Sequence, residues 1–225
     1  LPPMEETAKP LSDVPAINRF LSLCRMRTVP QKTVVIHAGD LPDILYYIVD
    51  GSVEVMIEDE DGNEMVLSYL NKGQFFGEMG LFYDQPTRSA WVRTRTACEL
   101  AEMTYPRFRQ IASESPGLVF ELATQLASRL ERTNRKLGDL AFVDVTGRVA
   151  HAIMDLCREP DAMTHPDGMQ IKVSRQELSR LVGCSREMAG RVLKVLEEQG
   201  LLTASGKTMV VYGVRPQQEP RRGSA

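Results

Sequence analysis

The sequence predicts an α+β fold in which a β-rich half, one long helix and a helix-turn-helix segment follow one another. From about Thr33 to Met103, short apolar runs alternate with turn signals, as in a sandwich or barrel. Between Pro116 and Phe142 the apolar period becomes helical, and residues 173–202 contain two short helical patterns around a glycine. We therefore expect a flexible start (1–16), a β domain (17–115), the long helix (116–142), a helix-turn-helix domain (143–215) and a disordered tail (216–225).

The composition is that of an ordinary folded protein. The chain has 225 residues, 43% hydrophobic and 25% charged, which is enough for two modest domains. No apolar run approaches the ~20 residues that span a bilayer. The start, LPPMEETAKPLSDVP, lacks the basic-then-apolar order of a secretion signal. We therefore expect a cytoplasmic protein that makes no membrane contact.

Cysteine, histidine and charge patterns narrow the possible chemistry. The four cysteines and three histidines are far apart in the sequence, so neither a zinc site nor a catalytic Cys/His pair is expected. The net charge is −3, yet the part from Ala141 onward holds 12 Lys+Arg against 10 Asp+Glu. Binding to nucleic acid must therefore depend on where individual arginines lie.

One strand of the β-rich half has a clear period of two. In SVEVMIE, residues 52–58, Val53, Val55 and Ile57 alternate with the other residues, and Asp50-Gly51 and residues 61–63 supply turn signals at its ends. This pattern predicts a strand with one buried face.

The stretch FGEMGLFYDQPTRSAWV, residues 76–92, suits neither a surface loop nor a core segment. Glu78 and Arg88 stand ten residues apart around an apolar segment, with glycines at Gly77 and Gly80. A surface loop would not need the apolar residues, and a core would not contain the acid and the base. The stretch therefore predicts a pocket for an anion.

The long helix carries a narrow apolar stripe, which we call the seam. Its members recur at alternating steps of four and three, over about three heptads. They are Val119, Ala123, Leu126, Leu130, Thr133, Leu137 and Leu140. A narrow stripe favours a two-helix dimer interface, and packing on the helix's own domain is the alternative. Thr133, with Asn134 after it, is polar, and a polar seam residue usually sets register or makes a specific contact.

Residues 173–202, VSRQELSRLVGCSREMAGRVLKVLEEQGLL, form a helix-turn-helix pattern. Ser174 and Ser185 are N-cap residues of two helices, and Gly183 supplies the turn between them. The apolar residues of the second helix predict a buried face made of Met188, Val192, Val195 and Leu196.

Three charged residues begin the second helix, namely Arg186, Glu187 and Arg191. This part of a helix-turn-helix meets base edges, where Arg binds guanine and Glu accepts from cytosine. The alternative is that these charges only solvate a surface helix. The hairpin LLTASGKTMVVYG follows and predicts a wing, with Lys207 at its tip in reach of a phosphate.

With these residues placed, the sequence resembles the cyclic AMP receptor protein family of bacterial transcription regulators, from about Ile17 to Val214. It is most similar to the proteobacterial members, through the runs LAFVDVTGRVA, PDAMTHPDGMQIKVSRQEL, VGCSREMAGRVLK and GKTMVVYG. The resemblance implies a jelly-roll-like β-roll that binds cyclic AMP, a dimerisation helix and a winged-helix domain. Two winged-helix domains would bind a palindromic operator with TGTGA-like half-sites.

The resemblance makes residues 76–92 a phosphate-binding cassette. Arg88 and Ser89 are implied to bind the cyclic phosphate, and Glu78 the ribose 2′-hydroxyl. Thr133 and Asn134, one from each subunit, are implied to contact the adenine amino group. The family commonly has a hydroxyl residue where this chain has Asn134, but an amide both donates and accepts. The implied nucleotide-binding set is Leu67, Ser68, Gly77, Glu78, Met79, Arg88, Ser89, Thr133 and Asn134.

Two surfaces for macromolecules are also implied by the resemblance. The DNA-binding set is Arg175, Gln176, Ser185, Arg186, Glu187, Arg191 and Lys207. The RNA polymerase contacts are Arg25, Arg27 and Arg107 in one group and Ala162, Thr164, His165 and Gly168 in the other.

Three functions follow as hypotheses. The first is a dimeric transcription regulator switched by cyclic AMP, and the second is the same regulator with cyclic di-GMP, cyclic GMP or no effector. The third is an enzyme that uses Glu78 and Arg88. An enzyme of this kind would need a metal cluster or an activated nucleophile, and the sequence has neither pattern, so we expect no catalysis.

Overall fold

The computed structural model describes residues 15–82 and 87–215. The chain divides into two compact units, which we treat separately. The sensor unit comprises the residues up to Asp59 together with Leu67–Thr133, and the reader unit comprises Glu60–Val66 and the residues from Asn134 onward. Helix α1 (Pro15–Ser22) begins within the start segment that was expected to be flexible, while residues 1–14 and the expected tail (216–225) lie outside the described residues.

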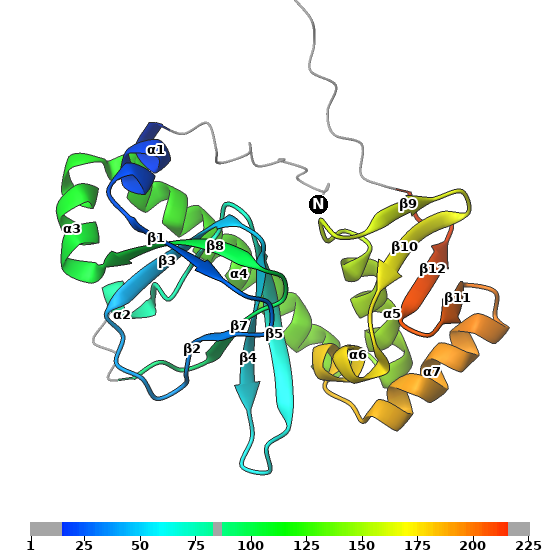
Figure 1. Ribbon diagram of the computed structural model, residues 1–225. Coiled ribbons are helices and arrows are strands. Elements are labelled where there is room, and N and C mark those ends of the chain that lie inside the picture. The colour runs from blue at the N-terminus through cyan, green and yellow to red at the C-terminus, as the bar shows by residue number, and fades with distance from the viewer. Residues whose placement is uncertain (1–14, 83–86, 216–225) are drawn as a thin grey trace, which may run out of the picture. The chain divides into compact units, whose positions relative to one another are not determined.

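Two four-stranded sheets build the sensor unit (Figure 1). One sheet has the order β1 (Arg25–Val29), β8 (Cys98–Thr104), β3 (Ile44–Asp50), β6 (Phe75–Phe76). The other has the order β2 (Val34–Ile36), β7 (Trp91–Thr94), β4 (Ser52–Glu58), β5 (Glu64–Asn71). Together with a long helix and a C-terminal helix-turn-helix region, this confirms the expected α+β class.

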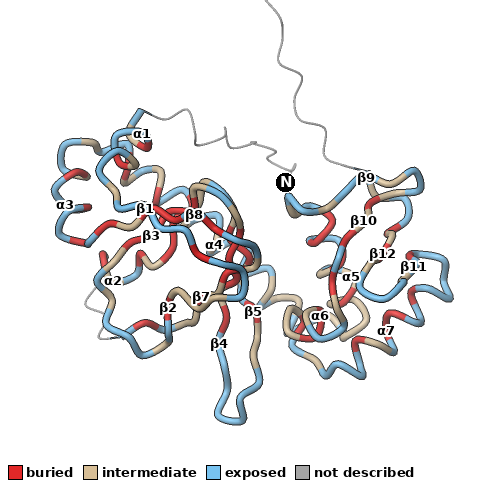
Figure 2. The backbone as a smooth tube through the Cα atoms, in the orientation of Figure 1, coloured by how far each residue is buried: buried red, intermediate tan, exposed pale blue. Residues whose placement is uncertain are grey.

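The period-two geometry of β3 divides the apolar core into two layers. Leu45 and Tyr47 pack against α1, α3 (Tyr105–Glu114) and the start of α4 (Pro116–Phe142). Tyr46 and Ile48 point to the opposite face, toward the second sheet. Figure 2 shows this buried backbone running through β3 and β8. The first sheet is therefore covered on both faces.

Strand β4 differs from the expectation that only one of its faces is buried. Val53, Glu54 and Met56 are all buried, whereas Ile57 is exposed. The physical reason is that β4 is an inner strand between β7 and β5, and Glu54 has a partner across the sheet. Arg93 of β7 binds Glu54 at 2.6 Å, which allows the carboxylate to be buried.

Helix α4 packs on the sensor unit with a flank that adjoins the seam. Leu118, Leu122 and Gln125 are buried on this flank. The seam residue Leu126 packs partly against the same core, but later in the helix the seam is uncovered in the single chain, with Leu130 at 62% and Leu137 at 64% exposed. The alternative that the seam packs on its own domain is therefore not realised along this part of the helix.

The reader unit contains three helices and one antiparallel sheet. The helices are α5 (Val145–Leu156), α6 (Arg175–Val182) and α7 (Arg186–Glu198). The sheet has the order β11 (Leu202–Ser205), β12 (Thr208–Tyr212), β10 (Gly168–Lys172), β9 (Met163–His165). Strand β9 forms although the segment from Arg158 to Gly168 contains two prolines, because a tight turn pairs Thr164 with Met169 of β10.

The predicted N-caps of α6 and α7, the two helices of the helix-turn-helix, are confirmed. Ser174 Oγ accepts the backbone N–H of Glu177, and Ser185 Oγ accepts that of Met188, each at 3.1 Å. Gly183 ends α6 with φ of 71°, a left-handed conformation that glycine adopts without steric cost.

The predicted buried face of α7 is wrong at two positions. Met188 and Val195 are exposed, and the buried residues are Ala189, Val192, Leu193 and Leu196. The small side chain of Ala189 fits under α7 where Met188 was expected. Met188 thereby lies on the outer face of the helix.

The turn between β4 and β5 and the first three residues of β5 belong to the reader unit. Glu64 forms an ion pair with Arg180 of α6 at 2.8 Å. The Met65 methyl group lies 3.7 Å from the place where a β-carbon on Gly183 would stand. Lys136 Nζ donates to the carbonyl oxygen of Val66 at 2.7 Å.

Among the described residues, none of the helices is both long enough and apolar enough to cross a bilayer.

The aromatic cluster around Phe20 should determine the stability of the sensor unit. Phe20 is fully buried and contacts Tyr47, Phe75 and Phe108 edge-to-face. Phe20→Ala should lower the free energy of unfolding by about 3–5 kcal/mol, because it leaves a cavity. Urea unfolding followed by the fluorescence of Trp91, the single tryptophan, would measure the loss. Leu41→Ala is the control, because Leu41 is 77% exposed, and equal stabilities of the two variants would contradict the prediction.

Candidate functional site

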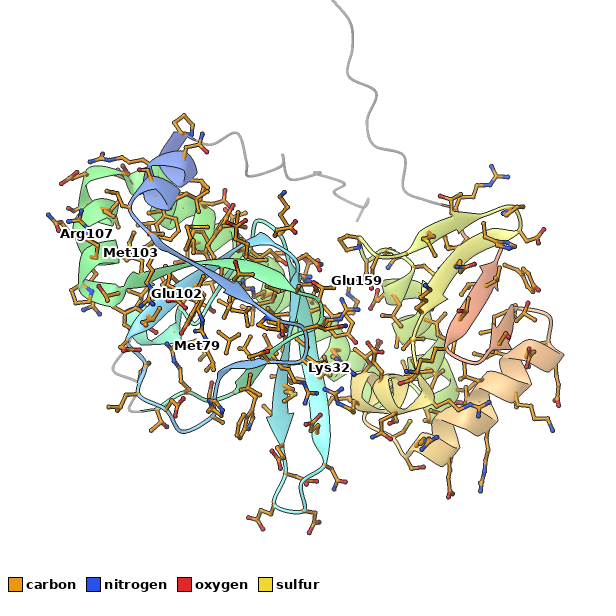
Figure 3. All side chains as sticks on the ribbon, in the orientation of Figure 1. Lys32, Met79, Glu102, Met103, Arg107 and Glu159 are labelled. Carbon is orange, nitrogen blue, oxygen red and sulfur yellow. The ribbon has the colours of Figure 1, made fainter. Side chains whose placement is uncertain are left out.

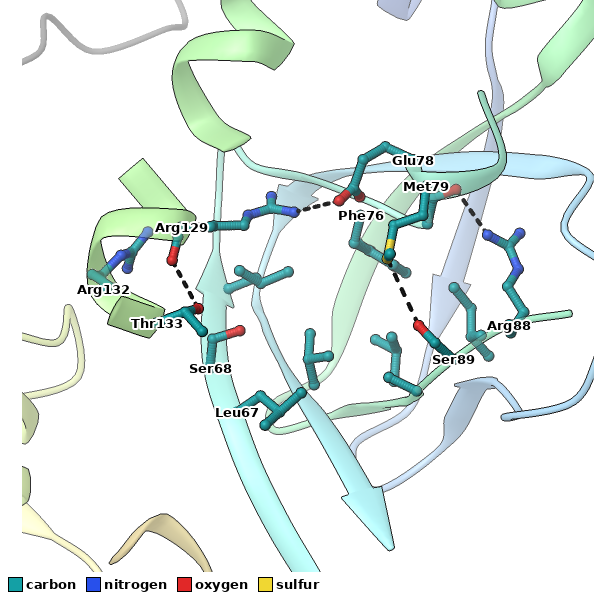
Figure 4. Close-up of a pocket in the computed structure, with 16 residues that line it drawn as sticks. Leu67, Ser68, Phe76, Glu78, Met79, Arg88, Ser89, Arg129, Arg132 and Thr133 are labelled. Carbon is teal, nitrogen blue, oxygen red and sulfur yellow. Dashed lines mark hydrogen bonds and ion pairs between the residues drawn. The ribbon is translucent and has the colours of Figure 1, made fainter. Parts of the chain in front are cut away.

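A pocket of about 260 Å³ lies in the sensor unit between β5, β7, the turn after β6 and helix α4 (Figure 4). The structure brings most of the expected nucleotide-binding residues to its walls. These are Leu67, Ser68, Gly77, Glu78, Met79, Arg88, Ser89 and Thr133. Asn134, by contrast, is not among the lining residues and belongs to the reader unit.

Arg88 is a buried cation held by neutral groups. Its guanidinium donates to the carbonyl oxygens of Gly77 at 2.8 Å and Ile44 at 2.7 Å, and to the hydroxyl of Tyr105 at 2.9 Å. Burial raises the pKa of the Tyr105 hydroxyl, so this phenol stays neutral. Within residues 15–82 and 87–215, Arg88 pairs with no carboxylate. A buried charge needs a counter-ion, and the pocket is where one can enter.

Gly77 allows the backbone to pass close to Arg88. Its φ is +75°, in the left-handed region. A β-carbon at this position would lie 3.1 Å from both Arg88 Nη1 and the Ile44 carbonyl oxygen. The sequence needs glycine here because any side chain would press on the groups that orient the arginine.

Glu78 is already paired with a cation from α4. Arg129 Nη1 lies 3.2 Å from Glu78 Oε1, and both side chains are largely buried. Arg129 also donates to the carbonyl oxygen of Phe75. Burial lowers the pKa of the Arg129 guanidinium, and the carboxylate of Glu78 opposes that shift. In the described residues the carboxylate of Glu78 has no other hydrogen-bond partner, so its second oxygen is left to accept from a ligand.

Two hydroxyl groups complete the polar walls. Among the described residues, the side chain of Ser89 has one hydrogen-bond partner, the thioether sulfur of Met79 at 3.7 Å, and Ser89 is exposed. Thr133 donates its hydroxyl proton to the Arg129 carbonyl oxygen at 2.9 Å, so its lone pairs face outward as acceptors. The remaining walls are largely apolar, formed by Ile36, Val55, Leu70, Phe76, Ala90 and Val92.

Arg129 and Arg132 also line the pocket, and the sequence analysis missed them. A signal was available: a second stripe with steps of four and three runs one residue before the seam. Its members are Leu118, Leu122, Gln125, Arg129, Arg132 and Lys136. A stripe parallel to a dimer seam marks the flank of a helix that faces its own domain.

The expected DNA-binding residues gather on α6, α7 and the wing of the reader unit. Arg175 and Gln176 begin α6, and Ser185 caps α7 ahead of Arg186, Glu187 and Arg191. All of these side chains are exposed, as is that of Lys207. In the part of the chain that the structure describes, none of these three arginines forms an ion pair, and neither does Lys207.

Two contacts bring these basic residues together. The stem of Arg175 passes Gly190 of α7, where a β-carbon would lie 3.5 Å from Arg175 Cδ. The carbonyl oxygen of Lys207 accepts the N–H of Val173 at 2.8 Å, which holds the wing tip next to the start of α6. The result is a basic surface around the N-terminal half of α7, which suits a polyanion.

The residues that the resemblance implied for RNA polymerase lie in two places. Arg25 and Arg27 are exposed on β1, and Arg107 is exposed on α3 (Figure 3). Arg27 also forms an ion pair with Glu102 at 3.2 Å. The second group lies on and beside the β9–β10 hairpin, and it comprises Ala162, Thr164, His165 and Gly168.

No catalytic or metal constellation accompanies these sites in the described residues. No group of three or more His, Cys, Asp or Glu side chains there could hold a metal ion. All four cysteines are free thiols.

Comparison with known proteins agrees with this geometry. Residues 26–115 match the family model described as cyclic nucleotide-binding domain, and residues 171–202 match that of bacterial regulatory proteins, crp family.

The full-length relatives are regulators. The chain is 55% identical to the cAMP-activated global transcriptional regulator CRP of Salmonella typhimurium, over 92% of this chain and 98% of that protein. It is 54% identical to the cAMP-activated global transcriptional regulator Vfr of Pseudomonas aeruginosa, over 88% and 94% of the two chains. A solved structure of the c-di-GMP responsive global regulator CLP of Xanthomonas campestris is 50% identical, covers 88% of this chain and 99% of its own, and has a TM-score of 0.84. The chain therefore belongs to the crp family of bacterial regulatory proteins.

Proposed function

We propose that this chain is a dimeric, DNA-binding transcription regulator that responds to cyclic AMP and has no catalytic activity. The single observation that carries the effector assignment is Arg88, a buried guanidinium with no carboxylate partner in the described residues, at the wall of a pocket. Two relatives above half identity are named as cAMP-activated global transcriptional regulators, which supports the same effector here.

Each part of cyclic AMP has a complementary group in the pocket. The cyclic phosphate binds Arg88 and the hydroxyl of Ser89, because a guanidinium fork matches phosphate oxygens. The ribose 2′-hydroxyl donates to the free oxygen of Glu78. The adenine amino group donates to the outward lone pairs of Thr133. Asn134 of the second subunit also contacts the adenine amino group, from across the seam.

The seam couples the effector to DNA. Two copies of the uncovered stripe on α4 pack together as a coiled coil, which also brings two α7 helices to one DNA duplex. A palindromic operator with TGTGA-like half-sites, about 34 Å apart, fits such a dimer. Effector binding favours the dimer geometry in which both helices reach their half-sites. The exposed groups on β1, α3 and the β9–β10 hairpin contact RNA polymerase. The protein works in the cytoplasm.

Cyclic di-GMP is the second candidate effector, because the solved relative at 50% identity is a c-di-GMP responsive regulator. The pocket volume of about 260 Å³ lies below the roughly 300–1,000 Å³ of typical small-molecule sites. It therefore favours a mononucleotide over a dinucleotide. Calorimetric titration with each nucleotide distinguishes the two candidates.

The phosphate-binding assignment predicts a loss of cyclic AMP affinity in Ser89→Ala. The lost hydrogen bond to a charged group should weaken binding about tenfold or more, and Arg88→Leu should abolish it. Calorimetry gives both values. Thr87→Ala is the matched control, because Thr87 is exposed and does not line the pocket. A Ser89→Ala variant that binds as tightly as the control would contradict the assignment.

The switch predicts that DNA binding depends on the effector. In mobility-shift titrations on a palindrome of two TGTGA half-sites, cyclic AMP should lower the Kd by about 5- to 150-fold, the usual range of allosteric coupling. A duplex with both half-sites scrambled is the control for non-specific binding. Equal affinity for the palindrome with and without cyclic AMP would refute the proposed switch.

The base-reading role of α7 makes a separate prediction. Arg191→Ala should weaken binding to the palindrome by about 1–3 kcal/mol and relax the half-site preference, because a bidentate contact to guanine is lost. Lys194→Ala removes the same charge three residues further along the same helix. It should weaken binding to every DNA sequence equally. If both variants lost affinity for palindrome and scrambled duplex in the same ratio, Arg191 would be only a phosphate contact.

A further inference from the structure

Arg132 belongs to the α4 flank stripe, which is the set Leu118, Leu122, Gln125, Arg129, Arg132 and Lys136, and among the described residues it is the one cation of this stripe whose terminal nitrogens contact no acceptor. Before it in the stripe, Gln125 accepts the backbone N–H of Phe75 and Arg129 binds Glu78. After it, Lys136 donates to the Val66 carbonyl. Arg132 itself has one long hydrogen bond, from Nε to the Ser128 carbonyl at 3.4 Å. Its two terminal nitrogens contact no acceptor within the described residues.

The position of Arg132 directs it to the pocket rather than to a dimer partner. It lines the pocket together with Thr133, and Figure 4 shows the two side by side on the α4 wall. The seam residues before and after it are Leu130 and Thr133. In heptad terms Arg132 is therefore off the interface, on the side that faces its own domain. Its charge also lowers the pKa of Arg129, after burial and the opposing effect of Glu78, so the two guanidinium groups are neighbours.

The two groups at this end of the pocket have opposite hydrogen-bonding character. The hydroxyl of Thr133 donates its proton to the Arg129 carbonyl oxygen, so it can offer a ligand only its lone pairs as acceptors. A guanidinium presents only donors. The exocyclic group of adenine is a donor, so it suits Thr133. Guanine instead offers two acceptors, O6 and N7, at a spacing that a guanidinium fork binds with two hydrogen bonds.

We propose that Arg132 is a base-specificity residue that enables the pocket to bind guanine cyclic nucleotides, cyclic GMP first among them, through O6 and N7. This inference rests on the proposed function, because it uses the same phosphate and ribose contacts. It extends that function by giving the base end two alternative ligands. Adenine binds through Thr133, and guanine binds through Arg132.

Calorimetry with cyclic AMP, cyclic GMP, 7-deaza-cyclic GMP and cyclic di-GMP tests the proposal on the full chain. Arg132→Leu should weaken cyclic GMP binding about tenfold or more, since a bidentate pair is lost, and change cyclic AMP binding by less than about threefold. Wild type should bind cyclic GMP more tightly than its 7-deaza analogue, which lacks N7, and Arg132→Leu should bind the two equally. Arg132→Lys keeps the charge but not the fork, so it should resemble Arg132→Leu.

The matched control is Arg135→Leu, which removes the same charge from the same helix at an exposed residue that does not line the pocket. It should leave both affinities unchanged. Loss of both nucleotides in equal ratio in Arg132→Leu, or wild-type binding of cyclic AMP without cyclic GMP, would overturn the inference and leave the proposed function standing. Wild type that bound neither nucleotide would overturn the effector assignment as well. If Arg132→Leu weakened the binding of cyclic di-GMP alone, Arg132 would contact the dinucleotide, and the cyclic GMP assignment would be contradicted.

Discussion

The ion pair between Arg129 and Glu78 fixes how α4 is rotated about its own axis. Leu118 and Leu122 of the same flank are fully buried in the apolar core, and the buried carboxylate of Glu78 needs the cation that this rotation supplies. Because Arg129 is held by Glu78 and the Phe75 carbonyl, Arg129, Arg132 and Thr133 meet the pocket, and Leu130 is left exposed. The exposure of Leu130 and the placement of Thr133 at the pocket wall both follow from this constraint. Removing one partner alone would leave an uncompensated buried charge, which costs about 3–5 kcal/mol.

The charge balance of the pocket explains why an anionic ligand is expected. Glu78 and Arg129 neutralise each other, which leaves the positive charges of Arg88, which is buried, and Arg132, which is exposed. A cyclic nucleotide carries one negative phosphate charge and supplies the missing counter-ion. The same ligand binds only the folded pocket, so it should also stabilise the sensor unit by mass action. Binding and stability are thus two measures of one interaction.

Local signals were sufficient for some features and insufficient for others. The caps at Ser174 and Ser185 were predicted correctly because a cap depends on residues within one turn. The buried face of α7 was misplaced, since Met188 and Ala189 are both apolar and only the packed neighbours decide which one fits inside. Burial of Glu54 depends on Arg93, 39 residues away. Arg129 was missed for the same reason, because its partner lies 51 residues earlier, although the stripe it belongs to is visible in the sequence.

The turn between β4 and β5 has a topological consequence. Because residues 60–66 pack with the reader unit through Glu64 and Met65, the chain passes between the units after Asp59, after Val66 and after Thr133. A protease cut at any one of these passages would leave the two units covalently joined through the other two passages. A shortened chain that stops at Thr133 would keep the turn but lose the residues it packs on, and would present the Met65 side chain to water. The boundary at which this protein can be divided therefore lies at a hairpin as well as within the long helix.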